Sequence, residues 1–396
     1  MSLQEVRSYY PRFSESEFAR RYGLIRSEMK KRGLNCLVIY GDAGKTTHNQ
    51  ANVRWVSNAV DFETYTYVVF PAEGPLTLFV TLSHHVYGAM ARSVIDDVRW
   101  ATTKPGSAVA KRLKELKILK GKVGIVGDST FATESIPHDH FEDLRSKLPK
   151  VKFEPATRWY ERLQAVKSRE EIEWIQKGAE FTDIAMEACL KAIKPGVKEW
   201  EVFAATWKSA LEAGGAYMFQ LLGSTPMNNP TMHYPWPAIG TGSNRTIRTG
   251  DIVMTEISAA YWGYAGQIIR SVAVGQPTEE YKKLYELARK AYDEIRSLLK
   301  PGNTDQDVRK VGKIFQAEGF DYEILGHGWG QNLSHPLILR EYARKTAWKF
   351  ENGNVIMIEP NPYRAPGKAG IFIGNLNYID NEAKSFQKFP LEFFTV

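Results

Sequence analysis

Apolar and polar positions follow one pattern in the first part of the chain and another in the second. Over residues 1–158, short apolar runs such as 36–40 and 123–126 predict buried strands. Between such runs the apolar residues recur at helical spacing, as they do from Phe18 to Met29 and over 108–119. Strand and helix patterns that alternate in this way predict a compact α/β domain at the N-terminus.

The remaining residues, 159–396, contain a pattern that occurs twice. Gly250 opens an apolar run that ends at Glu256, and Gly353 opens one that ends at Glu359, each glutamate lying six residues after its glycine. A Lys-Pro-Gly turn and a helical stretch precede each run. We interpret this part as an α+β domain with an internal pseudo-twofold repeat, in which helices cover a curved antiparallel sheet.

The two glutamates at the ends of these runs are candidates for a functional site. A carboxylate is rarely buried without a partner, so two of them in the same register predict a shared site that receives one from each repeat. The alternative is a pair of surface glutamates at strand ends. If Glu256 and Glu359 lie close together without a metal ion, their repulsion should raise the pKa of one of them.

Composition and charge exclude several classes of protein. The 396 residues, with 43% hydrophobic and 24% charged positions, fit two globular domains, and no apolar run is long enough to span a membrane. The net charge of +7 is spread along the chain without a basic cluster, so we expect no nucleic-acid partner. Cys36 and Cys189 lie in apolar segments and are expected to be reduced packing residues of a cytoplasmic protein.

Several short motifs occur together in an order that is specific to one family. Val166-Lys167-Ser168 with Glu171, Gly250-Asp251, Gly326-His327-Gly328 and Glu359-Pro360 together resemble the pita-bread family of methionine aminopeptidase, prolidase, Xaa-Pro aminopeptidase and creatinase. The resemblance covers the whole chain. It implies a creatinase/prolidase-type N-terminal domain (1–158), a pita-bread catalytic domain (159–396) and a homodimer.

The resemblance also implies positions for metal ligands, and here the chain departs from the family. The peptidase members hold two ions with two aspartates, one histidine and two glutamates. Those positions fall on Glu256, Gln267, His327, Glu359 and Gly374. A neutral glutamine bridges two cations poorly and a glycine supplies no ligand, so we predict no metal and no cofactor. One weakly held ion on the histidine and the two glutamates stays open as an alternative.

These residues lead to a prediction of function. We expect a metal-independent, creatinase-like hydrolase of a non-peptide C–N bond in a small nitrogen-containing substrate. His327, Glu359 and Glu256 would carry out the acid–base chemistry, and His233 is a further catalytic candidate because no histidine lies where creatinase has its own. The alternatives are a lyase that abstracts a proton, a binding protein without catalysis, and a single-metal Xaa-Pro-type peptidase.

A further group of residues is expected to bind the substrate. Aromatic rings beside two carboxylates suit an ammonium or guanidinium group, although core packing is the alternative for each ring, and we expect it for Trp262. Asp61 lies in a loop that reaches the partner's site in creatinase-like dimers, unless it is a solvated loop residue. The expected substrate-binding residues are Gln267, His335, Trp329, Tyr264, Trp236 and Asp61.

Overall fold

The structure, a computed structural model, divides the chain into two compact units. It describes residues 2–42, 50–59, 64–128, 135–234, 242–341, 346–364 and 368–396. One unit comprises Met1–Gln164 with Gln331–Leu333, and the other comprises Ala165–Gly330 with Ser334–Val396. The sequence placed the boundary between the domains after residue 158. Each helix within the described ranges is too short or too polar to traverse a lipid bilayer.

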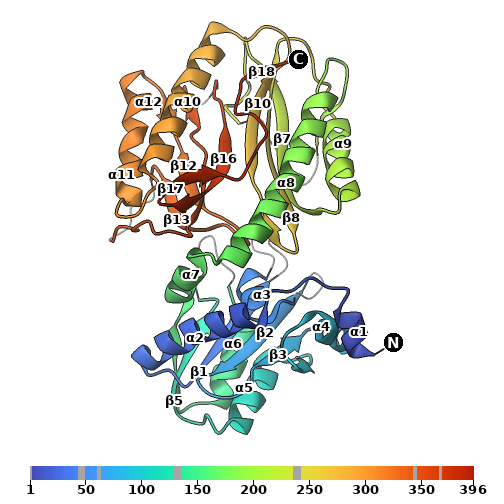
Figure 1. The fold of residues 1–396 in the computed structure, drawn as a ribbon, viewed down its shortest axis with the longest axis vertical. Helices are drawn as coiled ribbons and strands as arrows, with labels where there is room; N and C mark the ends of the chain where they lie inside the picture. The colour runs from blue at the N-terminus through green and yellow to red at the C-terminus, as the bar shows by residue number, and fades with distance from the viewer. Residues whose placement is uncertain are drawn as a thin grey trace. The chain divides into compact units, whose positions relative to one another are not determined.

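The N-terminal unit is built on a six-stranded sheet in the order β4-β3-β2-β1-β5-β6, in which β1, β5 and β6 run parallel (Figure 1). Its strands are β1 (Cys36–Asp42), β2 (Tyr65–Pro71), β3 (Thr77–Val80), β4 (Asp97–Trp100), β5 (Gly121–Val126) and β6 (Val151–Pro155). Its helices are α1 (Leu3–Arg7), α2 (Glu15–Arg32), α3 (Ala51–Ser57), α4 (His85–Arg92), α5 (Pro105–Glu115), α6 (His138–Lys147) and α7 (Thr157–Ala165).

Two apolar cores cover the two faces of this sheet. Residues of α2, α3, α4 and α7 pack on one face and residues of α5 and α6 on the other. The local signals in α2 explain its limits, because the Ser14 hydroxyl accepts from the backbone N–H of Glu17 and Gly33 ends the helix with φ 65°. The predicted α/β domain is therefore confirmed, with helices on both faces of a largely parallel sheet.

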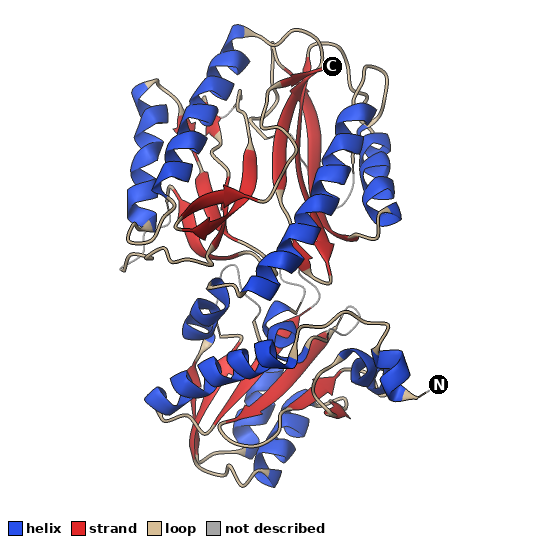
Figure 2. Ribbon diagram, in the orientation of Figure 1, coloured by secondary structure: helices blue, strands red, loops and turns tan. Residues whose placement is uncertain are grey.

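The C-terminal unit is built on a strongly curved ten-stranded sheet (Figure 2). Its strands are β7 (Ala216–Pro226), β8 (Asp251–Tyr261), β9 (Tyr264–Ala265), β10 (Ile268–Ala273), β12 (Ile324–Gly328), β13 (Ser334–Leu339), β14 (Val355–Ile358), β16 (Gly374–Asp380), β17 (Glu382–Ser385) and β18 (Phe394–Thr395), and β11 (Asp321–Tyr322) pairs separately with β15 (Pro362–Tyr363). Its helices are α8 (Arg169–Ala192), α9 (Glu199–Glu212), α10 (Glu279–Leu298), α11 (Asp305–Arg309), the 3-10 turn η1 (Lys310–Gly312) and α12 (Lys313–Ala317).

The strand order shows the internal repeat that the sequence predicts. The main path is β13-β12-β14-β16-β10-β8-β7, so strands of the first repeat join strands of the second where β10 pairs antiparallel with β16. Helices α8 and α9 cover the β7–β8 side, and α10 to α12 cover the other (Figure 1). The pita-bread fold with its curved antiparallel sheet is confirmed, and the pairing of β10 with β16 places the two copies of the motif in one sheet.

One detail of the predicted packing is wrong. Trp262 is expected in the core, but it sits in the tight turn between β8 and β9 with φ 47° and is 39% exposed. Periodicity does not reveal that Trp262 falls in the turn and not on a strand.

Candidate functional site

Strand register brings the predicted catalytic residues together in the C-terminal unit. On β10, Ile269 pairs with Glu256 of β8 on one side and with Gly374 of β16 on the other. On β14, Met357 pairs with His327 of β12, and Glu359 follows the end of this strand. Glu256 lies on β8, His327 on β12 and Glu359 just after β14 of one sheet, so the repeat supplies one glutamate to each side of the β10–β16 junction.

His327 and Glu359 form a buried hydrogen-bonded pair. The Nε2 atom of His327 lies 3.2 Å from Oε1 of Glu359, and the side chains are 5% and 3% exposed. On the other side of the ring, Nδ1 lies 2.9 Å from the carbonyl oxygen of Gly328. A carbonyl can only accept, so Nδ1 carries a proton, and the imidazole ring is held at both nitrogens.

Glu256 lies next to this pair and is hydrogen-bonded to Gln267. The amide Nε2 of Gln267 donates to Oε1 of Glu256 at 2.5 Å. Burial and, second, the negative charge of Glu359 raise the pKa of Glu256 to about 8, against the opposing effects of His327 and the amide donor. Burial is the larger cause, and the like-charge repulsion that the sequence predicts for two glutamates in one site adds to it.

The same cluster keeps His327 protonated more readily than an ordinary histidine. Burial lowers its pKa, but the charge and hydrogen bond of Glu359, the carbonyl of Gly328 and the charge of Glu256 together outweigh it, so the pKa of His327 is raised. Glu256 and His327 therefore both hold their protons to higher pH than free side chains of their type, a pattern that is common at sites of acid–base chemistry.

Two buried polar atoms at this cluster have no hydrogen-bond partner within the described residues. One is Oε1 of Gln267, an acceptor on the amide that donates to Glu256, and the other is the indole N–H of Trp329. The Trp329 ring packs edge-on against His327 at 5.5 Å and against Phe219 at 5.7 Å. An orphaned buried donor or acceptor costs roughly 1–3 kcal/mol, so both atoms point to a ligand, water or ion that completes the site.

Gly374 shows why the family's last carboxylate has no place here. A Cβ atom at this position would lie 2.4 Å from the carbonyl oxygen of Ile358 and 2.7 Å from Cε of Met357. The strand is also fixed from its other side, because Arg270 donates to the carbonyl of Gly374 at 2.8 Å. Strands β14 and β16 approach so closely at this point that no side chain fits.

The side chains of the cluster limit the number of metal ions that it can hold. Among the described residues, no three His, Cys, Asp or Glu side chains already gather their donor atoms as a ligand set. Their oxygens and nitrogens are used for the His327–Glu359 and Gln267–Glu256 hydrogen bonds. With two carboxylates, one imidazole and the orphaned amide oxygen, the chemistry fits one divalent ion that replaces these bonds, and it does not fit two.

His233, the fourth predicted catalytic residue, belongs to a different set of contacts. Its Nε2 lies 3.4 Å from Oε1 of Glu323, and its ring stacks on Tyr363 with centroids 4.4 Å apart. The next residue, Tyr234, donates to the carbonyl of Asn361 at 2.6 Å. Burial raises the pKa of Tyr234 strongly, the charge of Glu323 adds to the effect, and the charge of Glu359 makes a smaller contribution.

Tyr234 is a site residue that the sequence analysis missed. Its ring tilts against Phe372 at 5.5 Å, and its hydroxyl lies close enough to Glu359 to be influenced by that charge. The only available signal was its position beside His233. An aromatic residue in a loop is common, so that position alone does not distinguish a site residue from a packing residue.

The remaining predicted binding residues are found in different places. His335, on β13, packs with its backbone against Gly328 and its ring lies 6.3 Å from that of Trp348. Tyr264 donates to Oε1 of Glu171 on α8 at 3.1 Å and is buried there, which favours packing over substrate contact. Trp236 and Asp61 lie outside the described residues.

Comparison with known families identifies the chain. Residues 21–166 match the creatinase/prolidase N-terminal domain, and residues 173–381 match metallopeptidase family M24. The chain belongs to metallopeptidase family M24. The predicted resemblance to the creatinase/prolidase group is thereby confirmed, and the predicted hydrolase class agrees with an M24 protein, whereas the lyase alternative does not.

This M24 chain is similar to known relatives in sequence and to solved structures in fold. It is 28% identical to the Xaa-Pro dipeptidase of Pyrococcus horikoshii over 234 residues, which cover 58% of this chain and 64% of that protein. It is also 28% identical to the Xaa-Pro dipeptidase of Pyrococcus furiosus over 261 residues, which cover 64% of this chain and 72% of that protein. The aligned stretch thus spans less than two thirds of the first relative. The fold of this M24 chain is similar to that of the X-Pro aminopeptidase of Thermotoga maritima, with a TM-score of 0.79 and 19% identity over 95% of this chain and 99% of that one. It is also similar to that of the prolidase of Pyrococcus horikoshii, with a TM-score of 0.76 and 24% identity over 95% of this chain and 100% of that one.

These findings correct the predicted function. The expectation of a metal-independent, creatinase-like hydrolase acting on a non-peptide C–N bond is wrong, because the family is one of metallopeptidases and the relatives are named Xaa-Pro dipeptidases. The error arose from treating the missing ligands at Gln267 and Gly374 as the loss of every ion. Their absence removes a two-ion site, while the remaining donors still suit one.

Proposed function

We propose that this M24 protein is a hydrolase that cleaves the peptide C–N bond of a small Xaa-Pro-type substrate with the help of one divalent ion. The names of its relatives support the substrate class. One observation carries the proposal: a buried His327–Glu359 pair with a second carboxylate, Glu256, beside it. Two carboxylates buried together are stabilised by a cation, as the raised pKa of Glu256 indicates.

In this proposal each residue of the cluster has its own role. His327, Glu359 and Glu256 would hold the ion, with Oε1 of Gln267 as a neutral fourth donor. A bound divalent ion supplies Lewis acidity to a peptide carbonyl and to an attacking water. The Gly328 carbonyl fixes the ring orientation of His327, and Gln267 fixes Glu256. Trp329 offers its free indole N–H to an acceptor on the substrate.

The pair of His233 and Glu323 is our candidate for proton delivery. Their nitrogen and oxygen atoms lie 3.4 Å apart, and the His233 ring is held in place by stacking on Tyr363. A histidine that contacts a carboxylate and is 23% exposed can pass a proton from solvent to a leaving amine. We therefore assign to it the protonation of the amine that departs when the C–N bond breaks.

Peptidase assays with defined ions test this proposal. Metal-free protein is incubated with manganese, cobalt or zinc, or with a chelator, and then with several Xaa-Pro dipeptides. We expect hydrolysis that needs one equivalent of ion and that His327→Ala lowers by at least about 100-fold, while the control His84→Ala at an exposed position keeps full activity. Hydrolysis that a chelator leaves unchanged would refute the ion, and no hydrolysis with any ion would refute the peptidase.

We also propose that the chain forms a homodimer, as the resemblance to creatinase and prolidase implies. Multi-angle light scattering on the eluate of a size-exclusion column measures the mass directly. A mass of twice 44.9 kDa at micromolar concentration is expected. A mass that stays at one chain over the same concentration range would contradict the dimer.

A further inference from the structure

The two repeats of the C-terminal unit are joined by a short stretch of strand pairing. Strands β10 and β16 share two residue pairs, one of which is Ile269 with Gly374. Glu256 pairs with Ile269 on the other side of β10, and Glu359 follows β14, which pairs with β16. The separation of the two glutamates is therefore set across this junction, and the groups that fix the junction also fix the candidate site.

The guanidinium group of Arg270, on β10, spans this junction. Its Nη1 donates to the carbonyl oxygens of Gly374 at 2.8 Å and of Ile269 at 2.7 Å. Its Nη2 donates to Oδ1 of Asn375 at 2.9 Å. Successive side chains of a strand point to opposite faces of the sheet, so Arg270 reaches the junction from the face opposite Glu256. It ties β10 to β16 where the backbone pairing is short.

The same guanidinium group also holds a later segment of the chain. Its Nε donates to the carbonyl oxygen of Pro390 at 2.8 Å, and its Nη2 donates to that of Phe389 at 3.0 Å. From α8, Oδ2 of Asp183 accepts from the N–H groups of Lys388 at 2.7 Å and Phe389 at 3.3 Å. Residues 388–390 are thus held at their carbonyl groups by a basic side chain and at their N–H groups by an acidic one.

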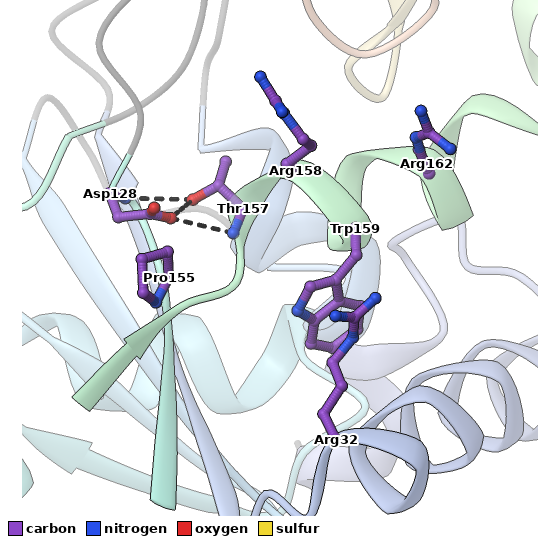
Figure 3. Close-up of a pocket in the computed structure, with 7 residues that line it drawn as sticks. All are labelled: Arg32, Asp128, Pro155, Thr157, Arg158, Trp159 and Arg162. Atoms are coloured by element: carbon purple, nitrogen blue, oxygen red, sulfur yellow. Dashed lines mark hydrogen bonds between the residues drawn. The ribbon is translucent and has the colours of Figure 1, made fainter. Parts of the chain in front are cut away.

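Complete burial distinguishes this arginine from the arginines of the N-terminal unit that Figure 3 shows. There, Arg158 and Arg162 extend away from Trp159, and both are exposed, as is Arg32 (Figure 3). Arg270 is 0% exposed, and its five hydrogen bonds all end on uncharged oxygen atoms. Arginine is almost never fully buried unless a partner for its charge lies beside it. The burial of Arg270 therefore requires a reason.

The energetics of burial favour a role in geometry over a role in stability. Burial lowers the pKa of Arg270 to about 10, against the smaller opposing charges of Tyr292 and Asp183. An apolar side chain of similar volume often stabilises a protein core as well as a buried charge does, or better. A guanidinium group in which each N–H has an acceptor instead fixes the acceptors in direction and distance, because its five donors lie in one rigid plane.

A second side chain braces the same junction. The hydroxyl of Ser271, also 0% exposed, donates to the carbonyl oxygen of Phe372 at 2.8 Å and accepts from the N–H of Phe372 at 3.2 Å. These two bonds take the place of a backbone pair beyond the point where the pairing of β10 with β16 ends. The ring of Phe372 lies 5.5 Å from that of Tyr234, so the brace is continuous with the loop that carries His233.

We propose that Arg270 and Ser271 are positioning residues that set the distance between the two halves of the candidate site. One half is Glu256 on β8, and the other is the His327–Glu359 pair. Both positioning residues act through the strands, by fixing β16 against β10, and not on the reacting atoms. The inference rests on the proposed function in one respect, because a fixed distance between two glutamates is what a single ion requires. The geometry of the metal-free cluster does not depend on that function.

Two measurements on the full chain test this role. Isothermal titration calorimetry gives the affinity of the metal-free protein for manganese, and NMR spectra of metal-free protein with isotope-labelled histidine rings report the surroundings of His327 at a fixed pH. Arg270→Lys keeps the charge but loses the planar set of donors, so manganese affinity should fall about 10-fold to 100-fold and the His327 signal should shift. Ser271→Ala removes two hydrogen bonds and should lower the affinity about fivefold with a smaller shift of the signal.

Buried residues of the same types in the N-terminal unit provide matched controls. Arg21 and Ser57 are both 0% exposed. Arg21→Lys and Ser57→Ala should lower the melting temperature but leave the manganese affinity and the His327 signal unchanged. An unchanged affinity and signal in folded Arg270→Lys, or in Ser271→Ala if the first variant does not fold, overturns the proposal, as do equal effects in the controls. If the unmodified protein binds no manganese, the one-ion function fails, and the His327 signal alone decides whether the two residues position the cluster.

Discussion

The amide of Gln267 donates to the carboxylate of Glu256 at 2.5 Å, at a position where the family resemblance places a second metal-binding carboxylate. A carboxylate at position 267 would only accept hydrogen bonds and would repel Glu256, whereas the amide donates a hydrogen bond to Glu256 and stabilises its carboxylate. The exchange lets Glu256 remain buried beside Glu359 with one partner for its charge.

Replacing Gln267 with glutamate should expose this relationship. In Gln267→Glu the amide donor is lost and a third buried carboxylate is added, so we expect a loss of about 3 kcal/mol in the free energy of unfolding at pH 8. At pH 5 the loss should be smaller, because a protonated carboxyl group can donate again. Urea denaturation in a chelating buffer measures both values. The exposed Gln276→Glu is the control, and an unchanged stability at pH 8 would contradict the hydrogen bond.

Restoring the missing ligand at Gly374 should fail for steric reasons. In Gly374→Glu the new Cβ would meet the carbonyl oxygen of Ile358, and even Gly374→Ala should cost at least about 2 kcal/mol. Neither variant should gain a second equivalent of metal in elemental analysis. Gly23→Ala, in helix α2 with nothing within 4 Å of the new atom, is expected to be neutral or stabilising. A stable Gly374→Glu protein that binds two ions would show that β14 and β16 can separate.

The free indole N–H of Trp329 should contribute to substrate recognition. In Trp329→Phe the ring still packs beside His327 and Phe219, but the donor is gone. We expect kcat/KM for the hydrolysed dipeptide to fall about fivefold while the melting temperature changes little, since one hydrogen bond is worth about 1 kcal/mol. The exposed Trp262→Phe serves as the control. If kcat/KM in Trp329→Phe equals that of the unmodified protein, the substrate does not accept from this indole.

The partly buried Asp183 on α8 should make stability depend on pH. Its Oδ2 accepts from the backbone N–H groups of Lys388 at 2.7 Å and Phe389 at 3.3 Å, while Oδ1 has no partner within the described residues. Burial outweighs these two donors and the charge of Arg270 and raises the pKa of Asp183 to about 6. A raised pKa stabilises the folded state below the unfolded value near 4, and this stabilisation is lost as the pH rises through about 6.

Comparison with Asp183→Asn isolates this effect. The unmodified protein should lose about 2 kcal/mol more than Asp183→Asn as the pH increases from 4 to 7. Urea denaturation at several pH values within this window gives the difference, and Asp293→Asn on the exposed side of α10 provides a matched substitution. Parallel curves for the unmodified protein and Asp183→Asn would show that the carboxylate is ionised at no cost.

Local signals in the sequence were enough to predict the elements and the repeat. Ser168 and Glu171, a pair readable from the sequence, form a capping box at the start of α8, and the six-residue spacing from glycine to glutamate predicted equivalent positions for Glu256 and Glu359 in the two repeats. Capping, turns and periodicity depend on residues within a few positions of each other, and for this reason a single sequence carries them. The pita-bread fold and the central residues of the candidate site could therefore be predicted from the sequence alone.

The partners of the site residues were decided by the tertiary structure. Which nitrogen of His327 meets Glu359, whether Gln267 donates to Glu256, and whether Gly374 leaves room for a side chain all depend on the register and spacing of strands that lie far apart in the chain. His233 likewise found Glu323, 90 residues away. Contacts of this kind form only when distant strands pair in the sheet. They depend on the register of the strands and on differences of tenths of an ångström in their spacing, and not on residue type.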